Sequence, residues 1–299
     1  MQIRRKIPVQ IERYFLSSVM LILLILLYAP VIAHWVDGWL HKTISIQHEY
    51  FSHGLLGLPF AAYIGWTYRK RWHRLPAACH PVGIGLLMLG VSFYLSALPD
   101  LINLSLPLVL TGLCLGLKGL AGFRLQAFPL FLVLLATPTQ LPYLIEPYAL
   151  PLQRFIAGTA GFILLQFGID VRVEQIYLFV NNQIVEVAPH CAGLKMLFTS
   201  LYVGLMLLYW TGNWGARKIT LLFLTSTVML SVTANILRNT ALTFFHGAGY
   251  DGAFHWLHES WGGDLYSAGV LVLLIVLLRG IERYGLGTLN SQTDEVSQV

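Results

Sequence analysis

The run PHCAGLK, residues 189–195, joins two apolar segments whose sequence patterns differ. Residues 171–187 before it are rich in Val and Ile and alternate with polar residues, whereas residues 194–210 after it are almost entirely apolar. Pro189 suits the first turn of a helix, because its φ is fixed at a helical value and its missing N–H is not needed there. The sequence therefore predicts a membrane helix that begins near Pro189, with Cys191 in its first turn.

A cysteine in that position has unusual electrostatics. The first backbone N–H groups of a helix have no partner and the helix dipole favours negative charge, which can lower a thiol pKa from about 8.5 toward neutral. Lys195, four residues on, shares the helical face of Cys191 in this interpretation. A lone cysteine at a membrane boundary is more often a small apolar residue, so the case for a reactive thiol depends on its neighbours.

The composition indicates an integral membrane protein. Of the 299 residues 56% are hydrophobic and only 11% are charged, and the mean hydropathy is +0.67. The net charge of +5 comes from basic residues clustered beside apolar runs, which is typical of cytoplasmic loops and not of nucleic-acid binding. The three widely spaced cysteines fit no disulfide or zinc framework. A lipid bilayer is therefore the expected environment.

Hydropathy and basic clusters predict about eight transmembrane helices. The expected spans are 17–36, which we interpret as a signal anchor, a stretch ending near 68, 82–98, 104–117, 125–136, 194–210, 219–237 and 265–278. Basic residues at 69–74 and 217–218 mark the cytoplasmic side, so both termini are expected in the cytoplasm. This topology places Cys191 and His258 on the outer, periplasmic face of an inner membrane.

Two predicted segments are not spans. Residues 141–168 contain several prolines and a short glycine-containing apolar stretch, which favours an interfacial or re-entrant segment. Residues 171–187 predict a short β-hairpin with its turn at Asn181 and Asn182. The expected fold is thus an all-α integral membrane protein with a hairpin on the outer face. Residues 1–285 are expected to form a single polytopic domain, followed by a polar tail, 286–299, disordered from about 290.

The predicted topology brings three chemically useful side chains to one membrane face. Cys191 precedes one span, Arg238 ends the 219–237 span, and His258 lies in the next loop. A thiol, an imidazole and a guanidinium together suit acyl transfer, as nucleophile, proton carrier and oxyanion stabiliser. Taken separately, Arg238 is interpreted equally well as a snorkelling arginine, and a lone histidine such as His258 is more often an interfacial residue packed beside tryptophans. His255, His258 and Glu259 lack metalloprotease spacing, so no metal is expected.

Four runs in this order resemble the exosortase/archaeosortase family. They are YFSHG at 50–54, CAGLK at 191–195, NILRN at 235–239 and HESWG at 258–262, and the resemblance covers residues 15–283. The CAGLK and WGGD forms are most similar to the cyanobacterial branch, the cyanoexosortases. The resemblance implies a membrane cysteine peptidase or transpeptidase with Cys191, Arg238 and His258 as its catalytic residues. It requires no cofactor.

The resemblance also implies the substrates and partners. These are exported proteins that carry a C-terminal sorting signal of the PEP-CTERM type: a Pro-Glu-Pro motif, one membrane helix and a basic tail. Cleavage passes through a thioester that an unknown acceptor nucleophile resolves. His53, Lys195, Asn235 and Glu259 are candidates for positioning the substrate. A membrane transporter and a non-catalytic assembly factor are the alternatives.

Overall fold

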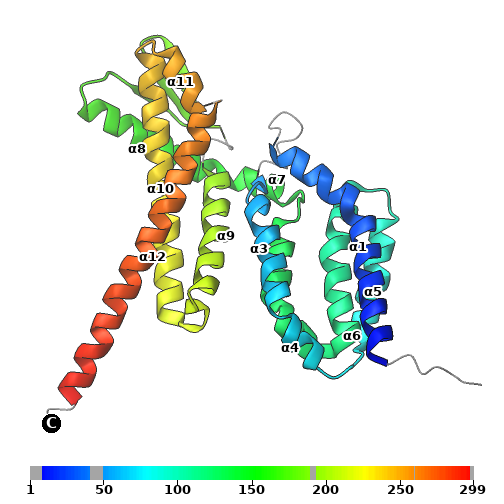
Figure 1. Cartoon of the computed structure of the whole chain (residues 1–299). Coiled ribbons are helices and arrows are strands. Elements are labelled where there is room, and N and C mark those ends of the chain that lie inside the picture. The colour runs from blue at the N-terminus through cyan, green and yellow to red at the C-terminus, as the bar shows by residue number, and fades with distance from the viewer. Residues whose placement is uncertain (1–8, 41–49, 189–192, 259, 297–299) are drawn as a thin grey trace, which may run out of the picture. The chain divides into compact units, whose positions relative to one another are not determined.

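The computed structural model describes residues 9–40, 50–188, 193–258 and 260–296. The chain divides into two compact units, Met1–Thr139 and Gln140–Val299, and each is described by itself. The first contains α1 (Val9–Leu40), α3 (Gly54–Thr67), α4 (Arg69–Arg74), α5 (Pro81–Tyr94) and α6 (Pro99–Ala136). The second contains α7 (Leu141–Ile145), η1 (Glu146–Ala149), α8 (Leu150–Gln166), β1 (Arg172–Glu174), β2 (Tyr177–Val180), β3 (Gln183–Glu186), α9 (Leu194–Trp210), η2 (Asn213–Gly215), α10 (Arg217–Gly247), α11 (Asp251–His258) and α12 (Trp261–Val296) (Figure 1). The single domain expected for residues 1–285 stays a prediction.

The helices are those of a membrane protein. Among the described residues, five stretches are long and apolar enough to cross a bilayer: Ser18–Leu40, Pro99–Ala136, Pro147–Gln166, Arg217–Gly247 and Trp261–Arg283. Two shorter helices, α5 and α9, are also apolar. The all-α membrane fold is therefore confirmed, while the number of about eight spans stays a prediction. Because α8 itself has the length and composition of a span, the interfacial placement of 141–168 also stays a prediction.

Helix α6 is two helices joined at a sharp reversal. Gly119 has φ 59° and ψ −155° within it, a conformation that glycine adopts at little steric cost. The Nδ2 of Asn103, near the start of α6, donates to the carbonyl of Pro138, just past its end, at 3.1 Å. The two halves therefore run back along each other, as the separate predicted spans 104–117 and 125–136 require. Trp35 of α1 donates to Oδ1 of the same Asn103 at 2.7 Å, which ties α1 to this pair.

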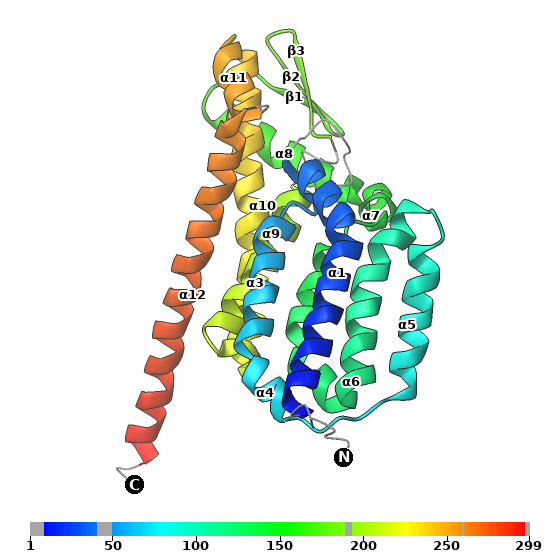
Figure 2. The ribbon, with the colours of Figure 1, turned by 45° about the vertical axis from the view of Figure 1, so that its right-hand side comes forward.

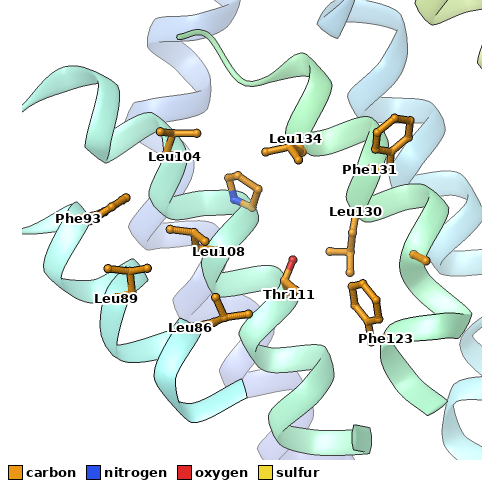
Figure 3. A pocket seen from close by; sticks show the side chains of 12 residues that line it. Leu86, Leu89, Phe93, Leu104, Leu108, Thr111, Phe123, Leu130, Phe131 and Leu134 are labelled. Atoms are coloured by element: carbon orange, nitrogen blue, oxygen red, sulfur yellow. The ribbon is translucent and has the colours of Figure 1, made fainter. Parts of the chain in front are cut away.

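An apolar pocket of about 480 Å³ lies between α5 and the two halves of α6 (Figure 3). Leu104 and Leu134 line one end of it, and Thr111 and Phe123 line the other. Residues from before and after Gly119 line the same end of the pocket because α6 reverses its direction at this glycine. Among the described residues, the lining is apolar except for the hydroxyl of Thr111.

The second unit contains a small antiparallel sheet in the order β1-β2-β3 (Figure 2). The predicted hairpin is β2-β3, and its turn residues Asn181 and Asn182 both have positive φ, of 47° and 65°. Two such residues match the twist of adjacent strands, and asparagine tolerates this conformation better than most residues. The hairpin is therefore confirmed, while the third strand, β1, was not predicted.

One face of the sheet packs on helices of the same unit. Leu178 and Val180 of β2 are buried in a cluster with residues of α8 and with Ile236 of α10. A side chain at Gly161 of α8 would collide with Val173, and one at Gly247 of α10 with Val180. These two glycines let the sheet approach both helices closely.

The span predicted at 194–210, after the PHCAGLK run, is confirmed as α9. Helix α9 begins at Leu194, and Gly193 precedes it as the N-cap with φ 78°. The left-handed backbone of Gly193 therefore rules out one continuous helix from Pro189 through this span. The placement of Cys191 in a first helical turn, on one face with Lys195, falls on residues outside the described ones and stays a prediction. Proline marks a favourable local start, but the left-handed backbone of Gly193 prevents a continuous helix through this point. Cys191 itself lies outside the described residues, as do Pro189 and Glu259.

Helices α10 and α12 are longer than predicted. Asn235, Arg238 and Asn239 lie inside α10, which continues to Gly247, and not at its end. The amide of Asn239 donates to the carbonyl of Asn235 at 2.9 Å, and Thr243 Oγ1 donates to the carbonyl of Asn239 at 2.8 Å. Polar side chains satisfied one turn back do not end a helix. Helix α12 likewise continues past residue 290 to Val296, where the sequence predicted disorder.

Candidate active site

Two of the three predicted catalytic residues, Arg238 and His258, lie on neighbouring helices of the second unit. Nη2 of Arg238, on α10, donates to the backbone carbonyl of Leu257 at 3.3 Å. Leu257 lies in α11 and is the residue directly before His258. Although 20 residues separate Arg238 from His258 in sequence, Arg238 therefore contacts the backbone of the residue before His258, and α10 and α11 are neighbouring helices (Figure 1).

The guanidinium of Arg238 has donors to spare. Arg238 is half-buried, and its Nε is buried without a hydrogen-bond partner among the residues described. Within that same set it forms no ion pair with a carboxylate. A buried guanidinium with unused N–H groups is costly unless an anion or a polarised oxygen meets it. The arrangement can therefore accept a developing negative charge.

Two glycines at the start of α12 bring this helix against the site. A Cβ at Gly263 would lie 2.9 Å from the carbonyl oxygen of Leu257 and 3.2 Å from Nη2 of Arg238. A Cβ at Gly262 would lie 2.6 Å from the carbonyl oxygen of Trp256. Any side chain would push α12 away from α11 and from the guanidinium. In the sequence, these residues are visible as two consecutive glycines just before a predicted span. Their spacing alone did not indicate a function for them.

His258 is held by an aromatic stack. Its ring lies 5.2 Å from that of Phe254, centroid to centroid, with an interplanar angle of 11°. Phe254 is one helical turn earlier on α11, and its ring also lies 4.8 Å from that of His246 on α10 and 5.9 Å from that of His255, centroid to centroid. The imidazole of His258 is therefore oriented by packing within α11. Sequence reasoning missed Phe254, since an aromatic residue four positions before a histidine is common.

The chain on either side of Cys191 is anchored within this unit. Before it, Val187 is fully buried and its carbonyl accepts a 2.9 Å hydrogen bond from Nε2 of Gln153 on α8. After it, Gly193 packs against the buried side chain of Asn235 on α10, and a Cβ at Gly193 would lie 2.6 Å from Cγ of Asn235. Asn235 is three residues, about one helical turn, before Arg238. Among the predicted positioning residues, Asn235 thus adjoins the flank of Cys191.

The remaining predicted residues are placed differently. Lys195 is the second residue of α9 and is half-buried. His53 belongs to the first unit, where it precedes α3 and its Nε2 forms a 3.1 Å hydrogen bond with the carbonyl of Leu135. Burial lowers the pKa of His53 to about 4, so its ring is neutral at pH 7 and Nε2–H donates to that carbonyl.

The part of the chain that the structure describes holds no group of three or more His, Cys, Asp or Glu side chains that could bind a metal ion. His246 and Asp251 approach each other, with 3.8 Å between Nδ1 and Oδ1, but as a pair only.

Comparison with known proteins identifies the family. The model of the transmembrane exosortase family (Exosortase_EpsH) matches residues 39–275, which include both sides of the Cys191 run and all of α10 and α11. No curated protein and no solved structure matches the chain. Since the family model covers most of the sequence and both halves of the site described above, this chain belongs to the transmembrane exosortase family.

Proposed function

We propose that this exosortase-family membrane protein is a cysteine peptidase or transpeptidase that cleaves C-terminal sorting signals of exported proteins through a thioester intermediate. One observation carries the proposal. Arg238 binds the backbone next to His258, and one turn along the same helix Asn235 contacts Gly193, two residues after Cys191. Because consecutive Cα atoms are about 3.8 Å apart, two residues limit how far Cys191 can lie from this helix.

In this mechanism Cys191 is the nucleophile. Its thiolate attacks the scissile carbonyl carbon, and the guanidinium of Arg238 stabilises the oxyanion that forms. The C–N bond then breaks as the imidazolium of His258 gives its proton to the leaving nitrogen, which leaves the thioester on Cys191. An amine, another acceptor or water attacks the thioester next, with His258 taking the proton from that nucleophile. The acceptor is therefore the second substrate.

Positioning roles follow from the neighbours of these residues. Asn235 fixes the end of the Cys191 run through Gly193. We assign Lys195 and Glu259 to the substrate, because their charges lie four residues after Cys191 and next to His258 in sequence. His53 is a weaker candidate, since its ring already bonds Leu135 within the first unit.

The expected substrates are exported proteins with a PEP-CTERM-like motif, one membrane helix and a basic cytoplasmic tail. Such a helix presents its motif at the outer membrane surface, where the positive-inside rule also places Cys191, His258 and both flanking loops. Confinement of both molecules to one membrane raises their effective concentration and limits their relative orientation. We therefore expect the active site on the outer face, with both termini in the cytoplasm.

Replacement of the nucleophile tests the enzyme against the alternatives. We expect Cys191→Ala and Cys191→Ser to abolish processing of a co-expressed protein that carries such a signal, by a factor on the order of 10³ or more. Serine fails because its hydroxyl ionises far less readily than a thiol. The measurement is the fraction of substrate cleaved, by immunoblot.

Two other cysteines provide matched controls. Cys79 is exposed and Cys114 is half-buried, and we expect Cys79→Ala and Cys114→Ala to leave processing unchanged. Alkylation of Cys191 should also be rapid near neutral pH and slow when Arg238 or Lys195 is replaced. Normal processing by Cys191→Ala would instead favour a non-catalytic assembly factor or a transporter.

A further inference from the structure

The small sheet has an unpaired edge. The strand order β1-β2-β3 leaves one side of β3 without a neighbouring strand among the described residues. The N–H of Val187 donates to the carbonyl of Ile176 at 2.9 Å, so the backbone groups of Val187 face the β2 side. Backbone groups alternate direction along a strand. Those of Ile184 and Glu186 therefore face away from β2, and we call these four N–H and C=O groups the free edge of β3.

The free edge is accessible. The side chains of Gln183, Ile184 and Glu186 are exposed, Ile184 by 58%. Natural proteins blunt an exposed edge with proline, lysine or a bulge, because unpaired backbone groups recruit other strands. Strand β3 is only four residues long and contains the charged Glu186, which limits pairing with a long sheet, but it contains no proline, lysine or bulge and keeps regular pairing with β2 throughout. An edge left open in this way suits a peptide partner.

The strand that carries the free edge is held in place. The turn of the hairpin is tied to α10 by a 2.9 Å hydrogen bond from Nδ2 of Asn181 to the carbonyl of Gly247. The far end is tied to α8 by the bond between Gln153 and Val187. Both attachments leave the backbone groups of Ile184 and Glu186 unused, so the edge is preorganised for binding.

The strand that carries the free edge comes shortly before the proposed nucleophile in the sequence. Strand β3 ends at Glu186, and Cys191 is five residues further along the chain. Beyond Cys191, the apolar helix α9 begins at Leu194. A sorting-signal substrate has the same order of parts: an extended segment, the scissile bond and then a membrane helix. A substrate that pairs with β3 in the parallel direction therefore has its parts in the same order as this chain has β3, Cys191 and α9.

We propose that the substrate segment before the scissile bond binds as a fourth strand on the free edge of β3, parallel to β3. The inference rests on the proposed function and adds how the substrate is held: through its main chain, by bonds to Ile184 and Glu186. Main-chain pairing gives affinity for any extended sequence, and side chains at alternate positions give selectivity. A substrate proline fits wherever its nitrogen points away from β3.

Proline substitution on the free edge tests the pairing. Ile184→Pro removes an N–H that faces the substrate but no bond to β2, so an edge strand tolerates it. We expect processing to fall about tenfold, the effect of one lost hydrogen bond, while the alkylation rate of Cys191 stays unchanged. The comparison variant is Ile184→Ala, which removes the side chain and keeps the N–H, and its processing should exceed that of Ile184→Pro several-fold. Normal processing by Ile184→Pro would overturn the proposal.

Photo-crosslinking tests the location and the direction even if a proline variant folds poorly. A photoreactive residue at 184 or 186, in a Cys191→Ala background, should capture the substrate, whereas one at Glu174 on β1 should not. Adducts from 184 should lie further from the scissile bond than those from 186. The reverse order, or equal capture at Glu174, would contradict parallel pairing on β3. If Cys191→Ala processes normally, the proposed function fails, whereas an inactive Cys191→Ala with no crosslinks at 184 or 186 defeats the strand addition alone.

Discussion

At the scale of single residues, Arg238 has the most informative environment. It lies within an apolar helix, donates one hydrogen bond to Leu257, and keeps Nε buried without a partner among the described residues. A guanidinium that merely snorkelled to lipid headgroups would lie at a helix end with its donors in water. The position in the helix and the contact beside His258 favour a catalytic role over that alternative.

Arg238→Lys should separate charge from geometry. Lysine keeps the positive charge but loses the planar set of donors that reaches Leu257 and an oxyanion together, so we expect processing to fall on the order of 10²-fold. The melting temperature in detergent should change little, because one half-buried hydrogen bond is lost. Arg217→Lys, at an exposed position on the same helix, is the control and should be silent. A loss of stability that matched the loss of activity would point to a structural role.

At the scale of helices and strands, close approach through glycine assembles the site. Gly262 and Gly263 let the first turn of α12 contact α11, and Gly193 lets the start of α9 contact α10 at Asn235. Small residues are the usual means by which membrane helices approach each other. The sequence predicted the end of α9 at Trp210 from the polar Thr-Gly-Asn run that follows it. It also predicted the β2-β3 turn from the Asn-Asn pair, since both features follow from local signals.

Gly263→Ala tests this packing. Its Cβ would meet the Leu257 carbonyl at 2.9 Å, so α11 must shift, and we expect a destabilisation of about 1–3 kcal/mol together with reduced processing. Gly269→Ala on the same helix meets nothing within 4 Å, and it should be neutral or slightly stabilising, because alanine is the better helix former. Thermal unfolding and substrate cleavage measure both effects. Similar behaviour of the two variants would refute the contact argument.

At the scale of the whole molecule, the distribution of basic residues sets the expected topology. Basic residues at 69–74 fall in and around α4, and Arg217 and Lys218 open α10. If these lie in the cytoplasm, the opposite end of α10, with Arg238 and α11, faces outward. That arrangement is the one in which an exported substrate reaches the site.

Cysteine labelling measures this topology. In a background without Cys79 and Cys114, cysteines placed at Arg71 and Arg217 should react with a membrane-impermeant maleimide only after the cells are permeabilised. Cys191 and a cysteine at His258 should react in intact cells, because both face outward in the predicted arrangement. Opposite labelling of positions 71 and 217 would require an additional membrane crossing between them, and α8 would then be the first helix to consider.

The sequence by itself determined the membrane class, the apolar helices, including the bounds of α9, and the hairpin turn, because hydropathy and turn preference are local properties. Only the tertiary structure decided that α10 continues past Asn239 and that Arg238 contacts the backbone beside His258. These features depend on which faces of packed helices meet. Asn239 and Thr243 seem to end α10 in the sequence, but their side chains are buried and donate hydrogen bonds to backbone carbonyls one turn earlier. Sequence periodicity alone cannot reveal the neighbouring helices that bury them.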